Sequence, residues 1–176
     1  MSTTGIAVSK YDEICEIAAA ARNSWFARKQ RCLQYMVTLI HGGLVTYCGI
    51  PKEQVSFMRW DEAQQQYLEA GEGHNYFIPA ALEYDEEGDY WHMGVVISLP
   101  TRWVSFGLCV SEGEDGKPMV RVARAGQMRQ IDFADAQQCN EFYDSIVALI
   151  KQALQNPRKS AKAIGFDIGS SEKEEL

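Results

Sequence analysis

Apolar residues recur at helical spacing in the first quarter of the chain. Their spacing of three, four or seven positions is typical of one face of an amphipathic helix. The pattern predicts one long helix from residue 11 onward, or two helices if Asn23 and Ser24 interrupt it, and Gly42 and Gly43 are expected to end or loosen it. The positions on this face are Tyr11, Ile14, Ala18, Ala21, Trp25, Cys32, Met36, Leu39 and Ile40.

Residues 52–70 have the composition of a second, more weakly amphipathic helix. Pro51 can occupy the first turn of a helix, because its missing N–H is not needed there. The segment that follows is rich in Glu, Gln, Ala and Met, which favour helices, until Gly71 and Gly73 stop it.

The middle of the chain changes from helical period to the period of two that is typical of strands. Segments 77–84, 89–99, 104–110, 119–124 and 129–133 alternate in this way, and Gly, Pro and Asp mark most of their connections. These segments predict a five-stranded antiparallel meander. The expected opposite pairs are Leu82 with Trp91, Ile97 with Phe106, Leu108 with Val122, and Val122 with Ile131.

In this register one face of the sheet is strongly apolar, as expected of an antiparallel sheet that helices cover on a single side. A last helix is predicted from the stripe that begins at Cys139, with Asp135 as its cap and Pro157 after its end. The fold class is therefore α+β, with N-terminal helices and a C-terminal helix packed on one face. We expect a flexible N-terminus over residues 1–10, one domain over 11–168 and a disordered acidic tail over 169–176.

The other face of the predicted sheet carries small and polar residues. The register places Arg121 opposite both Cys109 and Asp132, and His92 opposite Ser111, around a shallow floor of Gly, Ala and Ser. A floor of small residues lets another group approach closely. That group could be the chain's own 52–70 helix, a partner protein or peptide, or a small ligand. The candidate binding residues are Glu83, His92, Cys109, Ser111, Arg121, Gln130 and Asp132.

Composition narrows the class of protein. The 176 residues are 46% hydrophobic and carry a net charge of −7, which disfavours nucleic-acid grooves and anionic membranes as partners and fits a basic one. The five cysteines are scattered and odd in number, which predicts reduced thiols in a cytoplasmic protein. Residues 2–10 lack the features of a signal peptide, and no apolar run reaches the roughly 20 residues of a membrane span.

Motifs for metal, cofactor or phosphate binding are missing from the sequence. His41, His74 and His92 are far apart and no Cys-x-x-Cys occurs, so we predict no metal and no cofactor. An enzyme could still use Cys109 as a nucleophile with His92 as its base and Arg121 lowering the thiol pKa. The spacing of Cys109 and His92 in the predicted register, roughly 7 Å, gives that site weak support.

The combination of an acidic surface, a missing catalytic motif and an exposed sheet face predicts a non-catalytic protein-binding module. Adaptors, secretion-type chaperones and inhibitor or immunity proteins of bacterial type belong to this class. The alternative is a small enzyme or ligand-binding protein that uses the Cys, His and Arg residues of the sheet face. A protein partner is expected, and the N-terminal apolar stripe, with Trp25 and Phe26, is a candidate seam for a homodimer.

Overall fold

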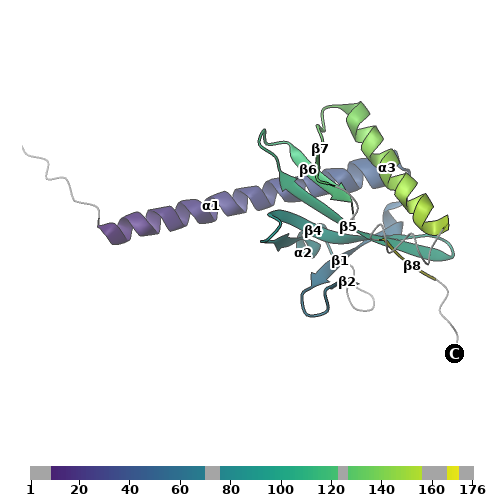
Figure 1. Ribbon diagram of the computed structural model, residues 1–176, viewed down its shortest axis with the longest axis horizontal. Helices are drawn as coiled ribbons and strands as arrows, with labels where there is room; N and C mark the ends of the chain where they lie inside the picture. Colours follow the sequence, from purple (N-terminus) through teal and green to yellow (C-terminus); the bar gives the residue numbers. More distant parts are fainter. Residues whose placement is uncertain (1–8, 70–75, 123–126, 156–165, 171–176) are drawn as a thin grey trace, which may run out of the picture.

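The computed structural model describes residues 9–69, 76–122, 127–155 and 166–170, and every structural statement below concerns these residues. The fold is α+β, as the sequence predicts (Figure 1). The helices are α1 (Lys10–Val37), α2 (Ile78–Ala81) and α3 (Ala136–Gln155), with a π-helical segment η1 (Thr38–Tyr47) and a short 3-10 turn η2 (Lys52–Gln54). None of them combines the length and apolarity needed to cross a membrane.

The N-terminal stripe forms one helix, α1, without a break at Asn23 and Ser24. A capping box fixes its start: the Ser9 hydroxyl accepts a hydrogen bond from the Asp12 N–H, and the Asp12 carboxylate accepts one from the Ser9 N–H, each at 3.1 Å. The chain does not leave the helical path at the glycine pair but continues through η1, so the expected loosening takes the form of a wider helical turn. Figure 1 shows α1 extending well beyond the sheet.

The sheet contains eight described strands instead of the five predicted. All pairs are antiparallel, in the order β2-β1-β4-β5-β6-β7, with β3 also pairing with β4 and β8 with β5. The strands are β1 (Val55–Asp61), β2 (Gln66–Glu69), β3 (Glu83–Asp85), β4 (Tyr90–Ser98), β5 (Arg102–Glu112), β6 (Pro118–Val122), β7 (Arg129–Gln130) and β8 (Phe166–Ser170).

The predicted helix over residues 52–70 is wrong, because this segment forms the β1–β2 hairpin. Helix propensity is a weak preference that strand pairing overrides: β1 pairs with β4, where Met58 lies opposite Gly94. The turn is set by local hydrogen bonding, since the Asp61 carboxylate accepts from the Gln64 N–H at 2.9 Å and Gln65 adopts a positive φ of 52°.

Two of the predicted strands are much shorter than expected. Segment 77–84 supplies only the start of β3, because residues 78–81 form the helical turn α2, with Pro79 in its first turn and the Ala81 side chain buried in the core. Segment 129–133 supplies only β7, since Asp132 turns the chain by accepting from the Ala134 N–H at 2.9 Å. Strand β8 includes Gly169 and Ser170, the first two residues of the predicted tail; residues 171–176 and 1–8 lie outside the described residues.

The predicted register holds between β5 and β6, while the other pairs are displaced by an even number of residues. The observed pairs include Tyr84 with Trp91, Ile97 with Val104, Leu108 with Val122, and Val120 with Arg129. Because side chains alternate with a period of two, an even displacement leaves each residue on its predicted face. The division into an apolar face and a small or polar face therefore survives.

The hydrophobic core lies between the apolar sheet face and the helices. Cys32, Met36 and Ile40 come to it from α1 and η1, and Phe142 and Ile146 come from α3. The sheet supplies Trp91, Met93, Val95, Ile97, Val104, Phe106, Leu108, Val110, Val120 and Val122. This arrangement confirms that helices from both ends of the chain cover one face.

The close packing of η1 against α3 makes Gly43 a sensitive position. A Cβ added at Gly43 would lie 2.0 Å from Cε1 of the buried Tyr143 ring. We expect Gly43→Ala to lower the free energy of unfolding by about 1–3 kcal/mol, as overpacking of a core commonly does, in urea titrations followed by circular dichroism. Gly42→Ala is the matched control: the nearest atom, Cγ2 of Thr38, is 3.9 Å away, and stability should not fall. Equal effects of the two substitutions would contradict the packing.

Candidate binding groove

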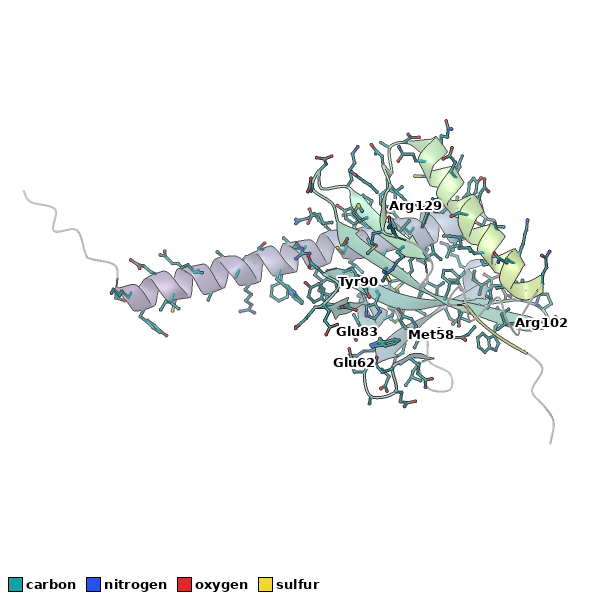
Figure 2. All side chains as sticks on the ribbon, in the orientation of Figure 1. Met58, Glu62, Glu83, Tyr90, Arg102 and Arg129 are labelled. Carbon is teal, nitrogen blue, oxygen red and sulfur yellow. The ribbon has the colours of Figure 1, made fainter. Side chains whose placement is uncertain are left out.

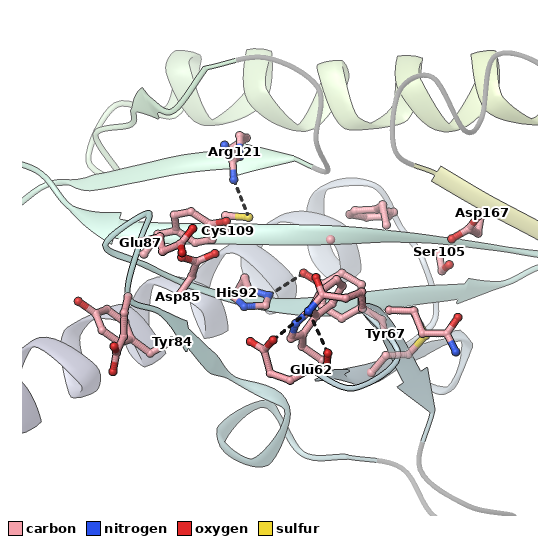
Figure 3. Close-up of a pocket in the computed structure, with 18 of the residues that line it drawn as sticks. Glu62, Tyr67, Tyr84, Asp85, Glu87, His92, Ser105, Cys109, Arg121 and Asp167 are labelled. Atoms are coloured by element: carbon pink, nitrogen blue, oxygen red, sulfur yellow. Dashed lines mark hydrogen bonds between the residues drawn. The ribbon is translucent and has the colours of Figure 1, made fainter.

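The small and polar sheet face forms the floor of a groove instead of an open surface. Strand pairing places Met58 of β1, Gly94 of β4 and Gly107 of β5 on this face, and Asp167 of β8 joins them opposite Ser105. The groove has a volume of about 1200 Å³ and is lined by these strands, by the β1–β2 hairpin and by the turn between β3 and β4 (Figure 3).

Tyr67 of β2 covers the centre of the floor. A Cβ built on Gly94 would lie 3.0 Å from Cγ of Tyr67, and one built on Gly107 would lie 2.9 Å from its hydroxyl oxygen. A Cβ at either position would force the Tyr67 ring to shift, and one at Gly94 would also lie 2.8 Å from the Cβ of Met58, so the two glycines allow this close approach. The hairpin therefore curls over the sheet, and the group that the small floor receives is part of segment 52–70 after all, as a strand hairpin and not as a helix.

His92 lies beneath this hairpin with only 8% of its surface exposed. A 2.8 Å hydrogen bond joins its Nδ1 to the Tyr67 hydroxyl, and the rings of Trp60, Tyr67 and Tyr90 surround it with centroids 5.7–5.8 Å away. Burial lowers the pKa of His92, and the carboxylates of Asp85 and nearby acids oppose that shift only in part. The imidazole is therefore neutral near pH 7.

Arg121 and Cys109 lie opposite each other on β6 and β5, as predicted. An Arg121 Nη donates to the Cys109 Sγ over 3.7 Å, and its guanidinium carbon lies 4.9 Å from the centroid of the Tyr90 ring (Figure 3). Burial raises the pKa of the Cys109 thiol, and Arg121 lowers it only in part. A protonated, buried thiol is a poor nucleophile.

Negative charge predominates around the groove. Its lining contains five carboxylates and one guanidinium. Burial alone would raise the pKa of Asp85, but hydrogen bonds from the Gly88 N–H, at 2.8 Å, and from Tyr90 bring it below its usual value. The carboxylates are those of Glu62, Asp85, Glu86, Glu87 and Asp167 (Figure 3).

The seven residues that the sequence singles out divide into two groups. His92, Cys109 and Arg121 line the groove, and His92 lies directly opposite Cys109 instead of opposite Ser111. The other four residues either form ion pairs or lie outside the lining of the groove. Glu83 forms an ion pair with Arg59, Asp132 forms one with Lys117 at 2.8 Å, and Ser111 and Gln130 each lie opposite Met119, outside the lining.

The sequence pattern does not predict the aromatic wall of the groove, which Trp60, Tyr67, Tyr90 and Trp103 form. The composition of residues 52–70 favours a helix, although Trp60 and Tyr67, which pair across β1 and β2, are the signal that could reveal a hairpin. The pattern does not predict Asp167 either, because β8 is distant in sequence from its partner strand. Within the described part of the chain, no three His, Cys, Asp or Glu side chains converge in a way that could hold a metal ion.

Comparisons with known proteins add no assignment. No protein-family model matches the chain, and searches of curated proteins and of solved structures likewise give no significant match. The class that fold and groove define is an α+β protein with an acidic, aromatic-lined groove on one sheet face.

The buried imidazole makes stability depend on pH. His92 has a pKa near 6.5 when unfolded and a lower one when folded, so its contribution is complete above about pH 6.5 and declines as the pH falls below that value. Thermal unfolding from pH 7.5 to 5 should therefore show a smaller decline in His92→Asn than in the original protein. His41→Asn, at an exposed position, should keep the original slope. Parallel slopes for all three proteins would contradict the burial of a neutral His92.

Thiol labelling separates a structural Cys109 from a catalytic one. All five cysteines are free; Cys15 is exposed, whereas Cys109 is 5% exposed and has a raised pKa. We expect a thiol-selective reagent at neutral pH to modify Cys15 first and Cys109 only after unfolding, as read by peptide mass spectrometry. Preferential modification of Cys109 in the folded protein would instead favour the enzyme alternative.

Proposed function

We propose that the protein is a non-catalytic protein-binding module whose groove takes a basic, extended segment of a partner protein. The observation that carries the proposal is the lining of the groove, with five carboxylates against one guanidinium around an aromatic wall. Charge of one sign in a concave, partly apolar site attracts and orients ligands of the opposite sign. The wall is formed by Trp60, Tyr67, Tyr90 and Trp103.

The groove already shows the chemistry that would recognise a basic side chain. Arg121 places its guanidinium over Tyr90 within cation–π distance. Lys or Arg side chains of a partner can use Trp60 and Trp103 in the same way while pairing with Glu62 or Asp167, which lie in the same lining. Protein segments combine such cations with the length needed to follow a groove of about 1200 Å³, which exceeds the roughly 300–1000 Å³ of common small-molecule pockets.

The alternative, a small enzyme or ligand-binding protein, has a specific basis in the contact between Arg121 and Cys109 and in the position of His92 opposite that cysteine. The direction of the pKa shifts weighs against catalysis, because the thiol is held protonated and the imidazole neutral, hydrogen-bonded to Tyr67. Binding without covalent chemistry is the better-supported activity.

Adaptors, secretion-type chaperones and inhibitor or immunity proteins of bacterial type are the classes in which we place this activity. A cytoplasmic location belongs to the same proposal, and five free thiols support it. The acidic composition of the chain supports a basic partner.

Selection from a random peptide library displayed on phage tests the proposal with the purified protein. We expect enrichment of peptides rich in Lys and Arg, and fluorescence anisotropy should show that their affinity falls as salt rises. Reversing two groove charges, Glu62→Lys with Asp167→Lys, should raise the Kd of a selected peptide about tenfold or more, because two attractive contacts become repulsive.

Glu114→Lys with Asp115→Lys is the matched control, since it changes the net charge equally at exposed positions of the β5–β6 turn, outside the groove. This control should bind the selected peptide nearly as the original protein does. An equal loss of peptide affinity in both double variants would show that only the net charge of the protein matters. Enrichment of acidic peptides whose binding depends on Arg121 would overturn the proposed ligand class.

A further inference from the structure

The first half of α1 projects from the domain as an arm, defined here as residues 10–24. Every residue of the arm is exposed, and the first ring contact with the sheet comes from Trp25, whose centroid lies 5.3 Å from that of Trp91. Figures 1 and 2 show no other element beside the arm, whose side chains stand out into open space. The arm is about 22 Å long at 1.5 Å per residue.

The exposed stripe of the arm continues the face by which α1 packs on the sheet. Successive residues of a helix are 100° apart, so Ile14 and Ala21 lie on the same side as the fully buried Cys32 and Met36. Beyond the edge of the sheet this side loses its cover: Ile14 is 64% exposed and Ile17, at its margin, is 70% exposed. Nothing in the described part of the chain covers this apolar stripe.

An uncovered arm of this kind is costly. Isolated helices of about 15 residues are only marginally stable in water, and most helical stability comes from packing an apolar face. The capping box at Ser9 satisfies the first backbone donors but buries no apolar surface. Burial of Ile14 and Ile17 would add the missing stabilisation.

We infer that the arm of a second copy of this chain covers the stripe, and that the two arms pair antiparallel. The domain that follows the arm, called the body here, excludes parallel pairing. Each body occupies the same side of α1 from Trp25 onward, so two parallel helices pairing through this face would force both bodies into the same space. Antiparallel arms meet mainly along residues 10–24 and leave the bodies at opposite ends.

Charge gives the same direction. After Lys10 the start of α1 is acidic, with Asp12, Glu13 and Glu16, whereas Arg22 lies near the other end of the arm. Antiparallel arms bring the acidic start of one copy toward Arg22 of the other, and they also oppose the two helix dipoles. Parallel arms would align the acidic starts.

Side-chain size sets the register. When Ile14 of one arm lies opposite Ala21 of the other, Ile17 lies opposite Ala18, and each large residue meets a small one across the pair. The same register brings the 73% exposed Tyr11 close to Trp25 of the partner copy, next to the 46% exposed Phe26. Trp25 and Phe26 form an aromatic pair at the edge of each body, and Tyr11 of the other copy would extend it.

Sedimentation equilibrium of the full chain tests the pairing. We expect a reversible dimer that Ile14→Lys with Ile17→Lys converts to a monomer, with a loss of helical circular dichroism because the arm loses its cover. Ala19→Lys with Ala20→Lys adds the same charge on the opposite, exposed face of the arm and should leave the dimer intact. A monomeric original protein at all concentrations, or dimerisation unaffected by the Ile14 and Ile17 changes, would overturn the inference.

Cross-linking tests direction and register. In a Cys15→Ser background, protein with Ile14→Cys is mixed with protein carrying Ala21→Cys and oxidised. The antiparallel register predicts mainly disulfides between an Ile14→Cys chain and an Ala21→Cys chain, recognised by intact mass. Positions 14 and 21 face each other across the pair, whereas two copies of position 14 do not. Disulfides between two Ile14→Cys chains would show parallel arms and reject the proposed direction. Neither readout involves the groove, so failure here leaves the proposed function untouched.

Discussion

The contact of Tyr67 with Gly94 and Gly107 is the constraint on which the groove depends. Two glycines opposite each other on β4 and β5 leave a gap in the side-chain layer, and the aromatic ring of β2 fills it. Because a Cβ at either position would meet the ring or Met58 at about 3 Å or less, the two glycines let the hairpin lie this close to the sheet without a shift of those side chains. The curl then buries His92, draws Trp60 beside it and turns a flat face into a groove.

The opposite face of the same strands packs against the helices. Its Val, Ile, Leu and Phe residues form a core with α1, η1 and α3, and polar contacts fix the position of α1 on the sheet. Arg28 pairs with Asp89 at 2.8 Å and Arg31 pairs with Glu112 at 2.7 Å, so α1 holds the β3–β4 turn and the end of β5 together. These ion pairs neutralise acidic groups near the turns, whereas among the described residues the carboxylates that line the groove form no ion pair.

The two proposed surfaces are independent in structure. The groove belongs to the face of the sheet away from the helices, whereas the arm lies beyond the edge of the domain (Figure 1). In an antiparallel dimer the arms occupy the space between the two bodies. Each copy would then offer its own groove, and a partner with two basic segments would bind with higher avidity than a partner with one.

Local periodicity was enough to predict the α+β class, helices at both ends of the chain and the two-faced sheet, although it left open whether the N-terminal stripe forms one helix or two. Every second residue of β4, β5 and β6 points to the helix-covered core. A displacement of the strand register by two residues does not change the face on which a side chain lies. Three of the seven candidate residues, His92, Cys109 and Arg121, follow from this alternation alone.

What only the tertiary structure decided was which strand lies over the glycine floor and which distant segments complete the sheet. The helix-favouring composition of residues 52–70 misleads because strand pairing with β4 outweighs propensity, and β8 joins β5 although residues 113–165 lie between them along the chain. The sequence by itself determined which way the side chains of β4, β5 and β6 face, since alternation along a strand is a property of neighbouring residues. The groove also contains Trp60, Tyr67 and Asp167. Contacts between residues far apart along the chain place these side chains there, and no local sequence pattern predicts such contacts.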